Sequence, residues 1–150
     1  MNTQVIKSLY KNMKNITESE VGKVNSIQCW EALQTRPNSY LIDVRTPEEW
    51  QETGIADLSS IKKDVNLLAW IFFTPHIHPN NDFLKELEHI LPSKQAELFF
   101  MCKSGGRSMQ AANAALSRGY NKVYNVDGGF VGNIEDNSGW MNSKLPRRAV

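Results

Sequence analysis

The chain has 150 residues, of which 41% are hydrophobic and 22% are charged, and its formal net charge is +1. This ordinary globular composition predicts one domain with a sizeable core. The small net charge excludes a general attraction for nucleic acid or an anionic membrane, so any anion binding has to be local. The longest apolar run, Leu67–Phe73, is too short to span a bilayer.

The first predicted element is an amphipathic helix over Val5–Ile16. It would place on one face the side chains of Ile6, Leu9, Tyr10 and Met13. We assign residues 1–20 to an N-terminal helical extension and residues 21–150 to the main domain. Packing of this helix on its own domain is favoured over a partner-binding or dimer helix. The same stretch lacks the uninterrupted apolar region of a secretory signal.

A second helix is predicted to begin near Ser26, an acceptable N-cap residue, and to end before Pro37. Three apolar residues recur at helical spacing around Cys29, namely Ile27, Trp30 and Leu33. We therefore interpret Cys29 as a core or helix-surface residue. The chain has two cysteines in unlike contexts, which favours a reducing, cytoplasmic location without a disulfide framework.

The next segment, Ser39–Val44, is predicted to be a buried strand that runs directly into a helix. Thr46 is a good N-cap residue, Pro47 suits the first helical position, and Glu49 would close a capping box. Between strand and helix, we interpret Asp43 as a buried hydrogen-bond acceptor rather than a general base. An Arg45–Glu49 ion pair is expected to fasten the turn.

The segment from Leu58 to Asn81 is long, and the sequence assigns it no clear role. Val65–Phe73 is predicted to be a strand that runs into a buried helix, and Thr74–Asn81 a surface loop that overhangs the active site. His76 and His78 lack a nearby cysteine or acidic companion, so they make a poor metal site. No metal site is predicted in this chain.

After a helix over about Asp82–Leu91, Leu98–Met101 is predicted to be a buried strand. An alanine-rich helix follows and ends at Gly119, which is placed as its C′ residue. The loop between strand and helix consists of Cys102, Lys103, Ser104, Gly105, Gly106, Arg107 and Ser108. A cysteine therefore starts a glycine-bearing turn that leads into a helix N-terminus.

Such a loop should attract anions, because free helix N–H groups and the helix dipole concentrate positive potential there. The two glycines allow successive amides to turn inward, and Lys103 and Arg107 add positive charge. We predict that the Cys102 sulfur is ionised, reachable and nucleophilic. A Cys29–Cys102 disulfide is left open, but it would block this nucleophile.

In tyrosine-phosphatase-like loops the arginine stands one position further from the cysteine, where this chain has Ser108. The shorter ring of amides suits a single outer sulfur better than a phosphoryl group. The sequence C-K-S-G-G-R-S resembles the active-site loop of rhodanese-like sulfurtransferases, and D-V-R-x-x-x-E from Asp43 to Glu49 resembles the family's first motif. The G-G-F, G-W and L-P pairs of the last part add weaker likeness, so the resemblance covers roughly Ser26–Pro146.

The alternation of strands and helices predicts an α/β fold, and the resemblance implies a single rhodanese-like domain with a mostly parallel twisted sheet and helices on both faces. The carboxyl ends of the strands should bring together on one rim Asp43, Arg45, Cys102 and Asp127. The resemblance implies a sulfurtransferase that carries a persulfide on Cys102 and takes a small anionic donor such as thiosulfate. The loop residues Lys103 to Ser108 would bind that donor, while Asp43, Arg45 and Glu49 would support the loop.

The acceptor would be a thiol or a protein, and no cofactor is implied. The main alternative is a rhodanese-like sulfur carrier or protein-binding module with little thiosulfate turnover. An arsenate- or phosphatase-type enzyme on the same fold is a further alternative, although the loop is one residue short of that pattern. A purely structural interaction domain is the last, and the retained cysteine argues against it.

Overall fold

A computed structural model describes residues 3–6 and 20–150 of the chain. Its centre is a five-stranded sheet in the order β1-β8-β7-β2-β4, in which every pair of neighbours is parallel. The strands are β1 (Gly22–Val24), β2 (Ser39–Asp43), β4 (Asn66–Leu67), β7 (Glu97–Met101) and β8 (Lys122–Val126). The expected α/β fold with a parallel sheet is therefore confirmed.

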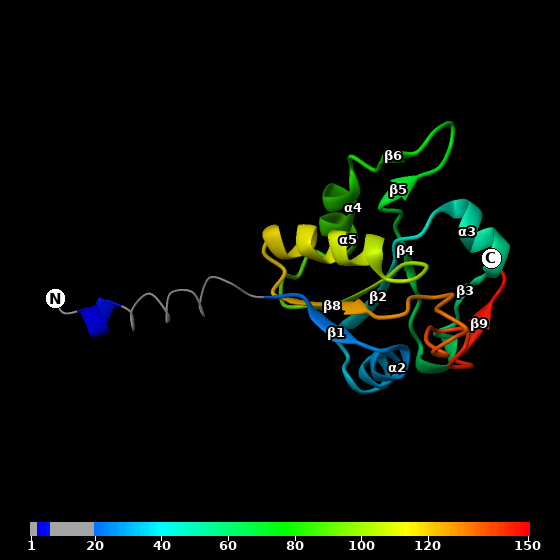
Figure 1. Cartoon of the computed structure of the whole chain (residues 1–150), viewed down its shortest axis with the longest axis horizontal. Coiled ribbons are helices and arrows are strands. Elements are labelled where there is room, and N and C mark those ends of the chain that lie inside the picture. Colours follow the sequence, from blue (N-terminus) through cyan, green and yellow to red (C-terminus); the bar gives the residue numbers. More distant parts are fainter. Residues whose placement is uncertain (1–2, 7–19) are drawn as a thin grey trace.

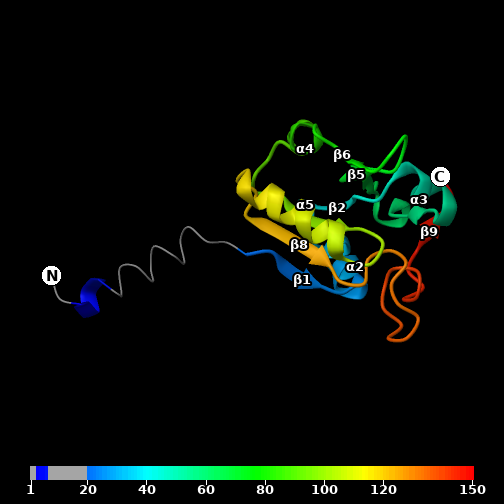
Figure 2. The ribbon, with the colours of Figure 1, turned by 45° about the horizontal axis from the view of Figure 1, so that its top comes forward.

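Helices cover both faces of this sheet (Figures 1 and 2). Helix α2 (Ser26–Thr35) lies on one face, and α4 (Phe83–Ile90) and α5 (Gly106–Ser117) lie on the other. A short helix, α3 (Pro47–Thr53), follows β2 beyond the carboxyl edge of the sheet. This arrangement leaves the starts of α3 and α5 close to the ends of the strands that precede them.

Two hydrophobic clusters, one on each face, form the core, and the central strands divide their side chains between them. In β7, Leu98 and Phe100 enter the cluster beneath α4 and α5, whereas Phe99 and Met101 enter the cluster beneath α2. This alternation follows from the two-residue period of a strand. Cys29 belongs to the α2 cluster and is fully buried, so its interpretation as a core residue is confirmed.

The structure corrects the predicted start of α2. The N-cap residue is Asn25, not Ser26, and its side chain accepts a hydrogen bond from the Gln28 N–H in a full capping box. Ser26 is the first helical residue and is 2% exposed. An asparagine amide is as good an N-cap group as a serine hydroxyl, so both Asn25 and Ser26 fitted the pattern.

The helix predicted within Val65–Phe73 is wrong. After β4, the chain forms a small antiparallel hairpin from β5 (Ile71–Phe72) and β6 (His78–Pro79). A second antiparallel pair joins β3 (Ile55–Ala56) to β9 (Arg147–Arg148). A 3-10 turn, η1 (Ser59–Ile61), precedes β4. A short apolar run does not distinguish a helix from an extended segment, which explains this error.

Most of the predicted helix Val5–Ile16 lies outside the described residues. The structure does describe residues 3–6, and these are helical. The division into an extension of residues 1–20 and a domain of residues 21–150 therefore stays a prediction. Within residues 3–6 and 20–150, the structure contains no helix with both the length and the hydrophobicity needed to cross a bilayer.

Candidate active site

The carboxyl ends of β2, β7 and β8 form one rim, because these strands are neighbours and run parallel. Asp43 ends β2 opposite Met101, so Cys102 comes directly after the paired residue. Asp127 directly follows β8. The expected gathering of Asp43, Cys102 and Asp127 at one edge is confirmed by this register.

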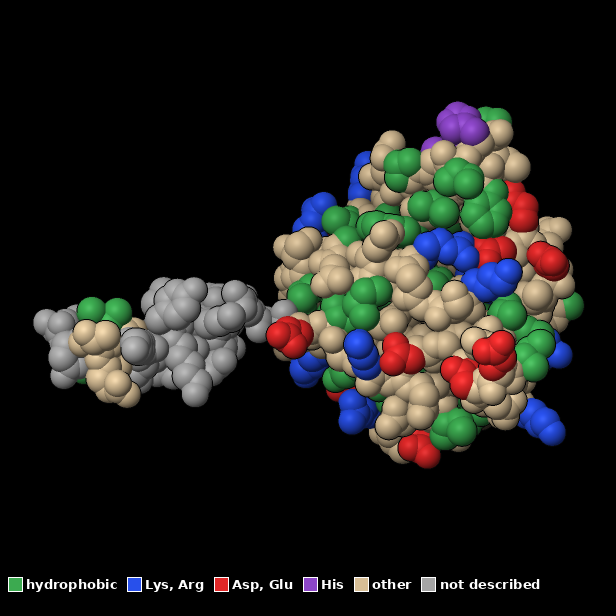
Figure 3. Space-filling model, in the orientation of Figure 1, with side chains coloured by type: hydrophobic (Ala, Val, Ile, Leu, Met, Phe, Trp, Pro, Cys, Tyr) green, Lys and Arg blue, Asp and Glu red, His purple; other side chains and the backbone are tan. Residues whose placement is uncertain are grey.

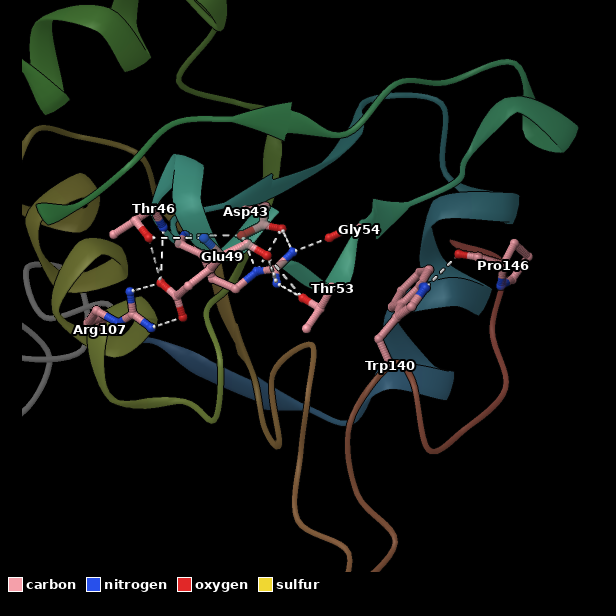
Figure 4. Close-up of polar contacts among 9 residues, drawn as sticks. Asp43, Thr46, Glu49, Thr53, Gly54, Arg107, Trp140 and Pro146 are labelled. Carbon is pink, nitrogen blue, oxygen red and sulfur yellow. Dashed lines mark hydrogen bonds and ion pairs between the residues drawn. The ribbon is translucent and has the colours of Figure 1, made fainter. Parts of the chain in front are cut away.

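The turn after β2 contains a fully buried ion pair. Asp43 and Arg45 are both 0% exposed, and the Arg45 Nη2 lies 2.8 Å from Asp43 Oδ2. The guanidinium also donates to the Thr53 hydroxyl and the Gly54 carbonyl (Figure 4). Its Cζ lies 4.0 Å from the centre of the Phe130 ring. Asp43 is thus the buried acceptor that the sequence predicted, and the pair fixes the rim.

The expected Arg45–Glu49 ion pair is wrong, because the Glu49 carboxylate faces Arg107 instead. Two hydrogen bonds of 2.6 and 2.8 Å join the two side chains, across the starts of α3 and α5 (Figure 4). The predicted capping box is confirmed: Glu49 also accepts from the Thr46 N–H. Burial alone would raise the pKa of the Glu49 carboxyl, but the bonds from Arg107 and Thr46 outweigh it and lower this pKa.

Cys102 lies at the floor of the loop between β7 and α5. Its Sγ accepts a hydrogen bond from the Gly105 N–H at 3.1 Å and lies 3.2 Å from Ser108 Oγ. Gly105 has a φ of 131°, which turns its amide inward and which a residue with a Cβ rarely adopts. Helix α5 begins at Gly106, so Arg107 and Ser108 belong to its first turn and not to the loop proper.

The sulfur is less accessible than the sequence predicted. Cys102 is 1% exposed, so the expectation of a reachable sulfur is wrong for the loop as it stands. Gly105 and Ser108 contact Sγ, and a second turn packs against the backbone of Cys102. A donor therefore reaches Sγ only if the loop opens.

That second turn is the G-G-F segment after β8. The Phe130 N–H donates to the Cys102 carbonyl at 2.8 Å, and the Val131 N–H donates to the Lys103 carbonyl at 3.1 Å. Gly129 has a φ of 61°, and a Cβ there would lie 2.3 Å from the Cys102 carbonyl oxygen. This close approach requires glycine, and it explains why a G-G pair accompanies the loop.

Two further residues, one beside Ser108 and one beside Arg107, were not predicted from the sequence as part of the site. Asn125, 3% exposed, has its Oδ1 2.5 Å from Ser108 Oγ, and its Nδ2 donates to Asp127 Oδ1 at 3.2 Å. The other is Phe73, whose ring centre lies 5.7 Å from Arg107 Cζ. An asparagine inside a strand and a phenylalanine in an unassigned segment give no local sign of a site.

The predicted donor-binding residues divide into two groups. Lys103, Ser104 and Gly106 are exposed at the mouth of the loop, and Lys103 has no ion-pair partner among the residues that the structure describes. Arg107, by contrast, is bound to Glu49, and this bond raises the pKa of its guanidinium. The expectation that Arg107 attracts an anionic donor stays a prediction, with its guanidinium engaged by Glu49 in this structure.

The two histidines of the hairpin lie close together, with 5.3 Å between the ring centres of His76 and His78. Nδ1 of His78 lies 2.7 Å from the carbonyl oxygen of His76, and the His78 ring packs near Phe72. No group of three or more His, Cys, Asp or Glu residues suited to a metal ion occurs in the described part of the chain. The hairpin begins next to α5, because Trp70 Nε1, directly before β5, donates to Gln110 Oε1 at 3.0 Å. That the Thr74–Asn81 segment overhangs the active site stays a prediction.

Comparison with known proteins identifies the arrangement. A family model described as Rhodanese-like domain matches residues 26–135. The uncharacterized protein RC0915 of Rickettsia conorii is 39% identical over 127 residues, which cover 84% of this chain and 96% of that protein. A thiosulfate sulfurtransferase, GlpE, of Tolumonas auensis is 31% identical over 107 residues, covering 71% of this chain and 83% of that protein.

Among solved structures, Rv0390 from M. tuberculosis has a TM-score of 0.77 and 34% sequence identity. The match covers 88% of this chain and 100% of that one. The architecture described above is therefore shared with it over nearly the whole domain.

Proposed function

Because the chain belongs to the rhodanese-like domain family, we propose that it is a sulfurtransferase that works through a persulfide on Cys102. The proposed reaction moves a sulfane sulfur from a donor such as thiosulfate to a thiophilic acceptor. The observation that carries this proposal is the environment of Cys102 Sγ. Sγ sits before the N-terminus of α5 and accepts a hydrogen bond from the Gly105 N–H. Both features stabilise a charged sulfur.

The first half of the reaction loads the cysteine. The Cys102 thiolate attacks the outer sulfur of thiosulfate, a new S–S bond forms, and the donor S–S bond breaks with its electron pair leaving on sulfite. In the second half, cyanide in an assay, or a thiol or a protein in the cell, attacks the outer sulfur and regenerates the thiolate. No net oxidant is needed. We place this reaction in the cytoplasm, in keeping with the two unpaired cysteines.

Loading requires the loop to open, since Cys102 is 1% exposed. Gly105 and Gly106 give the backbone the freedom for a small opening. The same burial favours one alternative function, a sulfur carrier that accepts sulfur slowly and turns over little thiosulfate. A carrier would be loaded by its donor in a single turnover yet would release little sulfite over repeated cycles.

Incubation with thiosulfate is expected to add the mass of one sulfur atom to Cys102 and to release sulfite. Intact-mass spectrometry with peptide mapping measures the adduct, and sulfite is assayed in the same sample. Cys102→Ala should remove both, whereas Cys29→Ala is the matched control and should retain both, because Cys29 is buried in the other core cluster.

If thiosulfate and mercaptopyruvate leave Cys102 unmodified while an aryl phosphate is hydrolysed, a phosphatase function would replace this proposal. Loading of Cys102 without sustained sulfite release would favour the sulfur carrier instead.

A further inference from the structure

The β5–β6 hairpin is fastened beside the cysteine loop and is not a loose surface loop. At its base, Trp70 Nε1 donates to Gln110 Oε1 on α5 at 3.0 Å. On its other side, the Thr74 hydroxyl donates to Glu48 Oε1 on α3 at 3.1 Å. The Trp70 ring also packs edge-on against a core phenylalanine, with 4.9 Å between ring centres. The hairpin thus spans the two helices whose N-termini flank the loop.

The hairpin carries exposed apolar side chains, among them Phe73 and Ile77. Figure 3 shows hydrophobic side chains gathered in the region of the hairpin at the top of the view, directly above basic and acidic side chains. One of them is Phe73, 37% exposed, whose ring centre lies 5.7 Å from Arg107 Cζ. Arg107 belongs to the first turn of the helix that follows the cysteine loop. An aromatic ring therefore lies beside that turn.

The charge at this entrance is smaller than the sequence indicated. The Arg107 guanidinium is held by both oxygens of Glu49, at 2.6 and 2.8 Å, so that pair is close to neutral as a unit. Lys103 supplies the exposed cation of the loop. One exposed cation on the loop and an exposed aromatic ring beside its first helical turn suit a singly charged donor with an apolar body better than a small dianion.

We propose that Phe73 determines donor specificity by favouring sulfane donors that carry their sulfur on an aromatic body. This proposal rests on the proposed sulfurtransferase function. With a thiosulfonate donor, the Cys102 thiolate bonds to the outer sulfur, the donor S–S bond breaks, and the electron pair leaves on the sulfinate. The aromatic body of the departing sulfinate would then lie against the Phe73 ring.

Two donors with the same charge and the same reacting group test this proposal: benzenethiosulfonate and methanethiosulfonate. The measurement is kcat/KM for each donor in the full-length protein, by sulfur loading of Cys102 and release of sulfinate. We expect Phe73→Ala to lower the ratio of the aromatic to the methyl donor by about three- to tenfold, the effect of one lost aromatic contact. Because the same two donors are compared in the unaltered protein and in Phe73→Ala, any difference in their intrinsic reactivity drops out of the change in ratio.

Two variants control for the hairpin itself. Phe73→Leu keeps an apolar side chain and should recover part of the ratio. Ile77→Ala, at a 71% exposed residue on the other side of the same turn, should leave the ratio unchanged. Equal loss for both donors, or no loss, in Phe73→Ala would overturn the specificity role. Failure of the proposed function would differ from either result, because the unaltered protein would then load sulfur from neither donor nor from thiosulfate.

Discussion

The hydroxyl of Ser108 has one proton and three acceptors within reach. They are Cys102 Sγ at 3.2 Å, the Gly105 carbonyl at 3.1 Å and Asn125 Oδ1 at 2.5 Å. The orientation of Asn125 determines which acceptor receives the proton. The Asp127 carboxylate can only accept hydrogen bonds, so the amide nitrogen of Asn125 has to face it. The Asn125 oxygen then faces Ser108 and takes its proton. In this state the hydroxyl cannot donate to the sulfur.

Removing this acceptor should make Cys102 more reactive. In Asn125→Ala the Ser108 proton is free to donate to the sulfur anion, a charge-assisted bond that favours the thiolate. We expect alkylation of Cys102 by iodoacetamide at about pH 6 to become about three- to tenfold faster, corresponding to about 1 kcal/mol. Peptide mapping separates Cys102 from Cys29, whose thiol pKa is raised by burial.

A double variant distinguishes this effect from easier access through the space left by the amide. Asn125→Ala combined with Ser108→Ala lacks the hydroxyl proton, so it should alkylate as slowly as Ser108→Ala alone. If the double variant keeps the whole gain, access and not the Ser108 proton explains it.

At the scale of elements, the first turns of α3 and α5 are tied together by Glu49 and Arg107. This bond should contribute about 1 to 2 kcal/mol to stability, since both side chains are largely buried, 12% and 20% exposed. The folded-state pKa of Glu49 is lowered, so its contribution is fully present above the unfolded pKa of about 4.3 and is lost as pH falls further.

Glu49→Gln should therefore cost most of this stability at pH 7 and much less near pH 3. Urea unfolding of both proteins at the two pH values measures the difference. Arg107→Gln is the matched variant: it removes the side chain that lowers the pKa of Glu49 most, so adding Glu49→Gln to it should change the pH dependence little. A gap between the unaltered protein and Glu49→Gln that stays constant from pH 7 to pH 3 would contradict this account.

The elements that the sequence predicted well are those whose signals are local. The strand before Asp43, the capping box of α3 and the Gly119 end of α5 each depend on neighbouring residues, and all three are present. The partner of Arg45 depends on the fold. Spacing of four residues favours Glu49 only inside a helix, and Arg45 precedes α3, so its side chain turns back to Asp43 at the sheet edge.

The residues of the candidate site also divide into those with a local signal in the sequence and those placed by the fold. The loop from Cys102 to Ser108 was recognisable because its residues are consecutive. Asn125 and Phe73 come from β8 and from the hairpin, and they reach the loop through the strand order and through contacts of the hairpin with two helices. Nothing in their own surroundings in the sequence indicates that contact.

On the scale of the whole molecule, the two core clusters share the same strands, so neither can lose its packing without exposing the other. Trp140 illustrates this coupling. It is fully buried beneath α2, its ring packs edge-on at 5.9 Å from Trp30, and its Nε1 donates to the Pro146 carbonyl at 2.7 Å. Cys102 belongs to the opposite cluster, beneath α4 and α5. A domain of this size is expected to unfold as one cooperative unit.

Trp140→Ala should lower the free energy of unfolding by about 3 to 5 kcal/mol, because it leaves a large cavity and removes one of the two hydrogen bonds to the Pro146 carbonyl, which keeps the one from the Asp57 N–H. Urea unfolding is followed by far-UV circular dichroism and, in parallel, by the exposure of Cys102 to iodoacetamide. Both midpoints should fall together, even though Cys102 lies on the other face of the sheet. Trp140→Phe keeps a ring but loses the bond to Pro146, so its midpoint should lie between those of the unaltered protein and Trp140→Ala. If Cys102 stays protected after the circular dichroism signal of Trp140→Ala has been lost, the two faces unfold separately, and the protection of the sulfur depends on its own cluster alone.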